Sequence, residues 1–128
     1  MKIDHIGYAV KNIDKSIQTF CLLGFNFESI IKDDDRNIYI AFGRNGEYII
    51  ELVSPISSGS PIDDVLKKNG STPYHICYRS DNYEDDIAIL LQKRFKIIIP
   101  PEKAIAFGGK RVVFMYNPVI GLIEIVEK

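Results

Sequence analysis

A repeat within the chain constrains its fold more than any other sequence feature. Asp4–Tyr8 (DHIGY) resembles Tyr74–Tyr78 (YHICY), and Ile49–Val53 (IIELV) resembles Leu122–Val126 (LIEIV). The histidines of the first two segments are 70 positions apart (75 − 5 = 70), and the glutamates of the second two are 73 apart (124 − 51 = 73). Nearly equal offsets in the same order indicate two copies of one structural unit with small differences in loop length. The sequence therefore predicts two similar halves.

The first half contains signals for four extended segments and one helix. Alternating apolar residues predict strands, apolar residues at helical spacing predict a helix, and Asn45-Gly46 predicts a hairpin turn. The charged run Lys32–Arg36 is interpreted as a solvated turn. The predicted elements are a strand at Ile3–Val10, a helix at Asn12–Phe20, an extended segment at Phe25–Ile30, and strands at Ile38–Phe42 and Tyr48–Val53.

The second half repeats this order after a polar linker and a short helix at Ile62–Lys68. Its elements are a strand at Tyr74–Arg79, a helix at Tyr83–Lys93, an extended segment at Phe95–Ile99 that Pro100-Pro101 ends, and strands at Arg111–Tyr116 and Leu122–Val126. This order predicts an α+β protein of two tandem βαβββ modules, with repeats at about residues 1–56 and 71–128. A chain of 128 residues is long enough for one domain with a core and too short for two ordinary ones.

Composition and the absence of targeting signals restrict the binding partners and the cellular location that we expect. The formal net charge is −1, so no strong field favours binding to a nucleic-acid backbone or an anionic membrane. The N-terminus lacks the features of a signal peptide, and no apolar run reaches the roughly 20 residues needed to cross a bilayer. We therefore expect a cytoplasmic protein that binds neither nucleic acid nor membranes. Cys21 and Cys77 are expected to be free thiols, because a core of this size needs no disulfide bond.

Two glutamates interrupt otherwise apolar strands, Glu51 in YIIELV and Glu124 in LIEIV. Burying an ionised carboxylate is costly unless a cation or strong hydrogen-bond donors compensate it. A single glutamate or histidine in a strand often faces water or has a structural role. Here both glutamates recur at matching positions of the repeat, and so do His5 and His75, the only histidines of the chain. This pattern favours one divalent metal held by all four residues.

The donor set restricts the metal. Two imidazoles and two carboxylates form a mixed nitrogen and oxygen set, which suits Zn, Ni, Co, Mn or Fe(II) better than Ca or Mg. We expect one divalent metal per site, Ni, Co, Zn or Mn, and the residues alone leave its identity open.

Five segments in order carry a resemblance to a known family. They are Ile3–Val10, Ile50–Pro55, Ser60–Ile62, Tyr74–Tyr78 and Gly109–Phe114. The chain resembles the vicinal oxygen chelate superfamily, which includes glyoxalases, bleomycin-resistance proteins and dioxygenases, and within it the methylmalonyl-CoA epimerases most of all, with glyoxalase I next. The resemblance covers essentially the whole chain. It implies a glyoxalase-like fold in which the two βαβββ modules form one cupped mixed sheet around a metal.

The resemblance also implies a site and a chemistry. The ligands of the superfamily correspond to His5, Glu51, His75 and Glu124, and the second of these positions is Glu or Gln in the superfamily. The implied activity is that of a metal-dependent isomerase or lyase that works through a metal-stabilised enolate. A ligand glutamate that loosens from the metal can act as the base. Glu124 is the first candidate for this role and Glu51 the second.

The chain departs from the epimerases in two places. Tyr39 stands where some epimerases have a candidate catalytic glutamate, and Asn117–Gly121 is shorter than their usual glycine-rich turn. Tyr39, Lys110 and Arg111 are candidate substrate contacts, although an aromatic residue in a strand usually packs and two basic residues at a strand start are often solvated. The resemblance implies a small-molecule substrate, either an acyl-CoA or a thiol adduct, and a homodimer.

Other members of the superfamily supply the alternatives. A glyoxalase I-like lactoylglutathione lyase would isomerise a thiol–methylglyoxal adduct at the same kind of site. A sequestering protein of the bleomycin-resistance type would bind a drug without catalysis, and we would expect it to have lost metal ligands. An extradiol dioxygenase holds Fe(II) with two histidines and one glutamate, which would require Glu51 to turn away from the metal.

Overall fold

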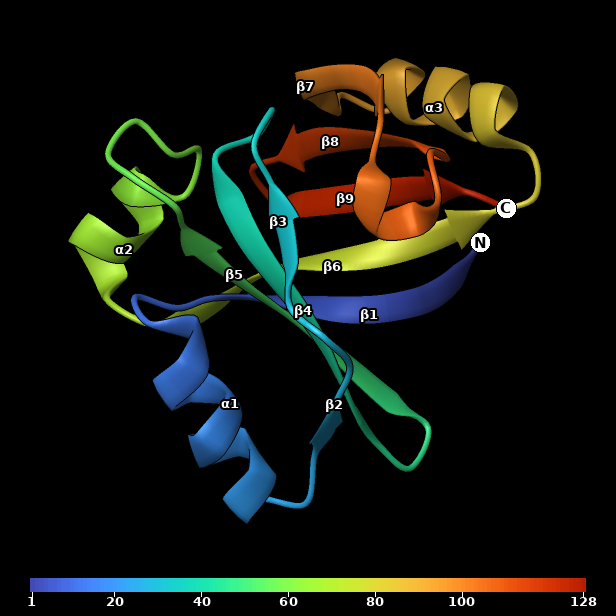
Figure 1. The fold of residues 1–128 in the computed structure, drawn as a ribbon. Coiled ribbons are helices and arrows are strands. Elements are labelled where there is room, and N and C mark those ends of the chain that lie inside the picture. The colour runs from blue at the N-terminus through green and yellow to red at the C-terminus, as the bar shows by residue number, and fades with distance from the viewer. The chain divides into compact units, whose positions relative to one another are not determined.

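The computed structural model describes residues 1–128 and contains nine strands and three α-helices (Figure 1). Its contacts divide the chain into two compact units. The N-terminal unit is His5–Tyr74, and the C-terminal unit combines Met1–Asp4 with His75–Lys128. The first four residues therefore belong with the second half of the chain.

The N-terminal unit is a mixed sheet with helix α1 on one face. Its strands run in the order β2-β4-β5-β1, and β3 also pairs with β4. Strands β1 and β5 are parallel, and the other pairs are antiparallel. The elements are β1 (Lys2–Ala9, whose start belongs to the C-terminal unit), α1 (Ile13–Leu22), β2 (Asn26–Phe27), β3 (Ile31–Asp33), β4 (Ile38–Asn45), β5 (Tyr48–Pro55) and α2 (Asp63–Asn69).

Helix α1 begins with a side-chain cap and buries its apolar face on the sheet. The Asn12 side chain accepts a hydrogen bond from the Lys15 backbone N–H at 3.0 Å, which satisfies one of the free donors at the helix start. Ile13 of the helix packs with Ile50 and Leu52 of β5. Since successive strand residues point to opposite faces, Glu51 projects from the face that α1 does not cover.

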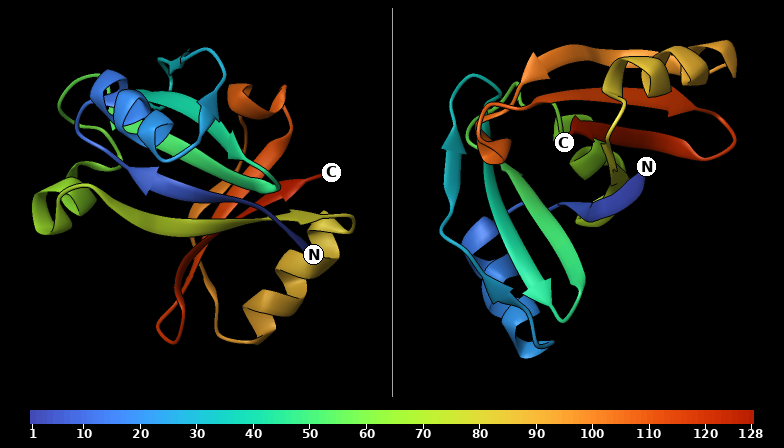
Figure 2. Two further views of the ribbon diagram at one scale, coloured as in Figure 1. Left: turned by 90° about the horizontal axis from the view of Figure 1, so that it is seen from below. Right: turned by 90° about the vertical axis from the view of Figure 1, so that its right-hand side faces the viewer.

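The C-terminal unit repeats the pattern. Its strands run in the order β6-β9-β8-β7, with β6 and β9 parallel and the other pairs antiparallel. Helix α3 covers one face of this sheet (Figure 2), and its Ile87 packs with Met115 of β8 and with Ile123 and Ile125 of β9. By strand alternation, Glu124 projects from the opposite face. The elements are β6 (Thr72–Ser80), α3 (Tyr83–Gln92), β7 (Lys96–Lys103), the 3-10 helix η1 (Ile105–Phe107), β8 (Arg111–Asn117) and β9 (Gly121–Glu127).

The prediction of an α+β fold with two βαβββ modules is confirmed, because strand, helix and further strands follow in the same order in both units. The short strands β2 and β3 of the first module take the place of the single strand β7 in the second. Cys21 and Cys77 are free thiols, as expected. None of the helices combines the length and the apolar character required to span a membrane.

Two local predictions were wrong. Pro100 and Pro101 do not end an extended segment, since β7 continues to Lys103 through two register shifts. β7 is an edge strand with only β8 as a neighbour. Proline lacks a backbone N–H, and on the open side of an edge strand no neighbouring strand needs that hydrogen-bond donor. The run Lys32–Arg36 is not wholly solvated either. Asp33 is 3% exposed, and its Oδ1 accepts a hydrogen bond from the Arg36 backbone N–H at 3.2 Å.

Candidate metal centre

His5 and Glu51 form a close pair in the N-terminal unit. Gly7 of β1 is the register partner of Glu51 on β5, and strand alternation places His5 on the same face as Gly7. His5 Nε2 lies 3.4 Å from Glu51 Oε2, and the two residues are 1% and 5% exposed.

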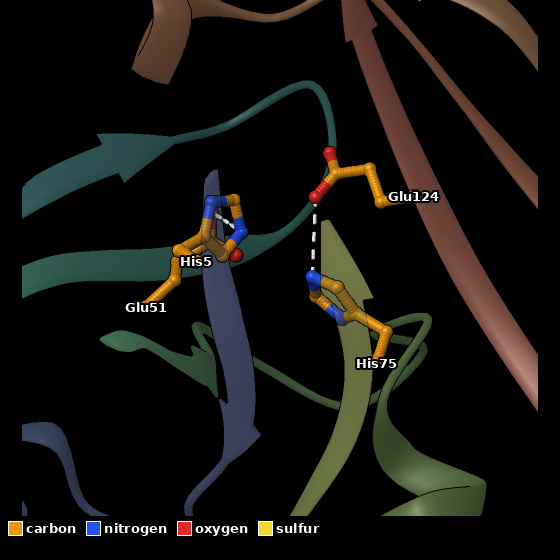
Figure 3. A group of neighbouring side chains, drawn as sticks. All are labelled: His5, Glu51, His75 and Glu124. Carbon is orange, nitrogen blue, oxygen red and sulfur yellow. Dashed lines mark ion pairs between the residues drawn. The ribbon is translucent and has the colours of Figure 1, made fainter. Parts of the chain in front are cut away.

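His75 and Glu124 form the equivalent pair in the C-terminal unit. Cys77 of β6 is the register partner of Glu124 on β9, and His75 precedes Cys77 by two residues. His75 Nε2 lies 3.1 Å from Glu124 Oε2, and the two residues are 4% and 2% exposed. Figure 3 shows the imidazole and the carboxylate of each pair turned toward each other.

The geometry and chemistry of each pair fit half of a divalent-metal centre. Two ligand atoms at about 2.1 Å from one ion and at right angles to each other are roughly 3 Å apart. The observed nitrogen–oxygen distances of 3.4 Å and 3.1 Å are close to this value. Imidazole nitrogen and carboxylate oxygen together suit Zn, Ni, Co and Mn. A nearby cation would also offset the cost of burying each carboxylate.

Each histidine ring also contacts a phenylalanine that the sequence reasoning did not single out. The His5 and Phe42 ring centroids are 5.6 Å apart at an interplanar angle of 79°, and those of His75 and Phe114 are 5.2 Å apart at 87°. The sequence does contain a signal. Each phenylalanine precedes the glutamate of its unit by nearly the same interval, nine positions in one unit (51 − 42 = 9) and ten in the other (124 − 114 = 10).

Tyr39 lies on the other face of β4. It is three positions from Phe42, so strand alternation separates the two side chains. The Tyr39 ring packs against the core beneath α1, which includes Ala41 and Leu52. The structure thus gives Tyr39 a packing contact on the helix-covered face, and its contact with substrate stays a prediction.

Of the two basic candidates, Lys110 is exposed and Arg111 is engaged by acidic neighbours. Arg111 donates from Nε to Glu127 Oε2 at 3.0 Å and from a terminal nitrogen to Glu84 Oε1 at 2.6 Å, and its guanidinium lies 4.9 Å from the Tyr83 ring centroid. Hydrogen bonds from Arg111 hold the pKa of Glu127 below its ordinary value. Burial raises the pKa of Tyr83 to about 12. The described contacts give Arg111 a role within its own unit.

Comparison with known proteins places the chain in a family. A sequence model of the Glyoxalase/Bleomycin resistance protein/Dioxygenase superfamily matches residues 4–114, which include His5, Glu51 and His75. A mitochondrial methylmalonyl-CoA epimerase of Dictyostelium discoideum is 30% identical over 99% of this chain and 78% of its own length.

Solved structures show the same fold. A hypothetical protein of Bacillus halodurans C-125 is 28% identical, with a TM-score of 0.88 over 99% of this chain and 94% of its own. The methylmalonyl-CoA epimerase of Mycobacterium tuberculosis is 24% identical, with a TM-score of 0.84 over 98% and 87%. The family match covers most of the residues, and the fold agrees with it. The chain therefore belongs to the glyoxalase/bleomycin resistance protein/dioxygenase superfamily.

Proposed function

We propose that this chain is a divalent-metal-dependent epimerase that inverts the carbon next to the thioester carbonyl of an acyl-CoA, with methylmalonyl-CoA as the first candidate substrate. One observation carries the proposal. Each repeat contains a buried histidine–glutamate pair, with nitrogen–oxygen distances of 3.4 Å and 3.1 Å. The Dictyostelium relative, which is 30% identical over 99% of this chain, is named as a methylmalonyl-CoA epimerase.

In this proposal the two pairs share one ion, with His5, Glu51, His75 and Glu124 as its ligands. All four residues are buried and each offers a ligand atom. The two carboxylates carry two negative charges when ionised, and one divalent ion balances both. The matching geometry of the two pairs supports a shared role in this proposal.

The residues of the chain move the proton. A bound divalent metal would supply Lewis-acid polarisation of the substrate carbonyl oxygen. A carboxylate oxygen of Glu124 takes the proton from the α-carbon, whose electron pair is delocalised toward the carbonyl. A proton from solvent water added to the opposite face completes the inversion, and Glu124 then gives its proton back to solvent. We assign Glu124 before Glu51, because the resemblance described above permits glutamine at the position of Glu51, and a glutamine amide is not a base.

The completeness of both pairs favours catalysis over simple sequestration. A protein that only sequesters a small molecule needs no buried carboxylate beside each histidine, and retaining these groups carries a desolvation cost. Both pairs are present and nearly inaccessible to water. The enzymatic proposal therefore accounts for groups that a binding protein would be expected to lose.

The test loads the purified protein separately with Ni, Co, Mn and Zn. For each metal, deuterium exchange at the α-carbon of methylmalonyl-CoA is followed by NMR, and turnover of the methylglyoxal–glutathione adduct is followed in parallel. We expect exchange with the CoA ester and little turnover of the adduct. Turnover of the adduct alone would favour a glyoxalase. Exchange with neither substrate, in protein carrying one metal per chain, would overturn the proposal.

We further propose that residues 1–128 act as one domain in a homodimer, as the family resemblance suggests, and that the protein is cytoplasmic, as the sequence analysis led us to expect. Light scattering after size-exclusion chromatography should give twice the chain mass of 14.6 kDa. Thermal unfolding should be a single transition followed equally by aromatic absorbance and far-UV circular dichroism. A monomer or two separate transitions would contradict these expectations, and fractionation of cells that produce the protein tests its location.

A further inference from the structure

The edge-on contact between a phenylalanine and each histidine is repeated in the two units. The ring centroids of His5 and Phe42 are 5.6 Å apart, and those of His75 and Phe114 are 5.2 Å apart, with interplanar angles of 79° and 87°. These values lie in the range in which T-shaped ring pairs are attractive. An aromatic contact of this kind restricts rotation of the imidazole about its Cβ–Cγ bond.

The strand register explains why the contact is possible in both places. In each unit, three residues on three adjacent strands are register partners in a row: a phenylalanine, the glutamate and a small residue. Side chains in such a row project from the same face of the sheet. The rows are Phe42, Glu51 and Gly7 on β4, β5 and β1, and Phe114, Glu124 and Cys77 on β8, β9 and β6. The small residue leaves room for the histidine two positions earlier, so its ring lies within reach of both the glutamate and the phenylalanine.

Ordinary core filling does not account for these phenylalanines. Neither Phe42 nor Phe114 belongs to the apolar clusters beneath α1 and α3. Both are half-buried, whereas the histidines beside them are 1% and 4% exposed. On the Phe114 face, Cys77, Val112 and Val126 form a further apolar cluster, and neither phenylalanine belongs to it.

We propose that Phe42 and Phe114 are positioning residues that hold the imidazoles of His5 and His75 in the rotamer that binds metal, before any ion is present. The proposal rests on the metal centre described under the proposed function. It adds that the orientation of the histidines is set by aromatic packing within each unit as well as by their glutamate partners.

The test compares leucine variants at four phenylalanines. Phe42→Leu and Phe114→Leu should each weaken Co²⁺ binding by about two- to tenfold, as expected from the strength of aromatic pairs. The matched controls are Phe27→Leu in the N-terminal unit and Phe95→Leu in the C-terminal unit, because both rings pack on the helix-covered faces. These controls should lower the melting temperature and leave Co²⁺ affinity within twofold of the wild type. Phe114→Tyr retains the aromatic ring and should bind Co²⁺ as tightly as the wild type.

A second measurement does not depend on the metal or on a folded variant. In the metal-free wild type, NMR should show nuclear Overhauser contacts between each imidazole and its phenylalanine, with one rotamer for each histidine. Averaged rotamers would overturn the inference, and so would Phe42→Leu and Phe114→Leu variants that bind Co²⁺ as tightly as the wild type. If the wild type binds no metal, the proposed function fails, and the rotamer measurement still shows whether the phenylalanines fix the orientation of the imidazoles.

Discussion

His75 Nε2 and Glu124 Oε2 lie 3.1 Å apart, in residues that are 4% and 2% exposed. Parallel pairing of β6 with β9 brings these two residues together across 49 positions of the chain (124 − 75 = 49). A buried carboxylate is costly unless positive groups or hydrogen-bond donors compensate it. The pair is therefore a place where loss of either partner, or of a bound cation, should have a measurable cost.

Glu124→Gln should reduce α-carbon exchange of methylmalonyl-CoA by about 10²- to 10⁴-fold, the usual contribution of a general base. Glu51→Gln should reduce it less, since a glutamine carbonyl oxygen can still serve as a ligand. Exchange rates of metal-loaded proteins measure both effects. Glu47→Gln, at the exposed β4–β5 turn, is the control and should behave as the wild type. Equal losses for Glu51→Gln and Glu124→Gln would remove the distinction between the two glutamates.

Metal removal should destabilise the protein. Binding to the folded state alone contributes about 2.7 kcal/mol when the free ion is at a hundred times its dissociation constant. Dialysis against a chelator should therefore lower the melting temperature by several degrees, and one equivalent of Co²⁺, Ni²⁺, Mn²⁺ or Zn²⁺ should restore it. His5→Ala should abolish most of this shift. Identical melting curves with and without metal would argue against a bound ion.

Glu127 should make stability depend on pH in the acidic range. Hydrogen bonds from Arg111 lower its pKa below the ordinary value of 4.5, so folding favours the ionised carboxylate. The resulting stability is present above pH 4.5 and is lost as the pH falls through the lower pKa of the folded state. Urea unfolding should show Glu127→Gln to be less stable than the wild type at pH 7, with the difference closing toward pH 3. A difference that is constant with pH would contradict this assignment.

Tyr83→Phe should leave stability at pH 7 unchanged or raise it by up to about 1 kcal/mol. The Tyr83 hydroxyl is buried without a hydrogen-bond partner, and an unsatisfied buried hydroxyl is costly. Burial raises its pKa to about 12, so the neutral phenol is favoured by folding, and this contribution is lost as the pH rises from 10 through 12. Urea unfolding between pH 7 and pH 11 measures both effects. A loss of more than about 1 kcal/mol at pH 7 would show that the hydroxyl has a stabilising partner.

Much of the fold and the four candidate ligands could be predicted from the sequence. Periodicity and turn residues are local signals, and they indicated strand and helix positions to within a few residues. The candidate ligands were identifiable because His5 and His75 are the only histidines and recur at matching positions. Local signals failed at Pro100-Pro101, where edge position in the sheet tolerates proline, and at Asp33, which is buried although it lies in a charged run.

By itself, the sequence determined the repeat, the α+β order of elements and the residue types available for metal binding. These features depend only on neighbouring residues and on the positions of matching residues along the chain. Only the tertiary structure decided which side chains meet. Strand register placed Phe42 beside Glu51 and Phe114 beside Glu124, and the same alternation turned Tyr39 toward the helix-covered face. It also engaged Arg111 with Glu84 and Glu127. The physical reason is that register depends on hydrogen bonds between distant segments, and a shift of one residue would turn each of these side chains to the other face.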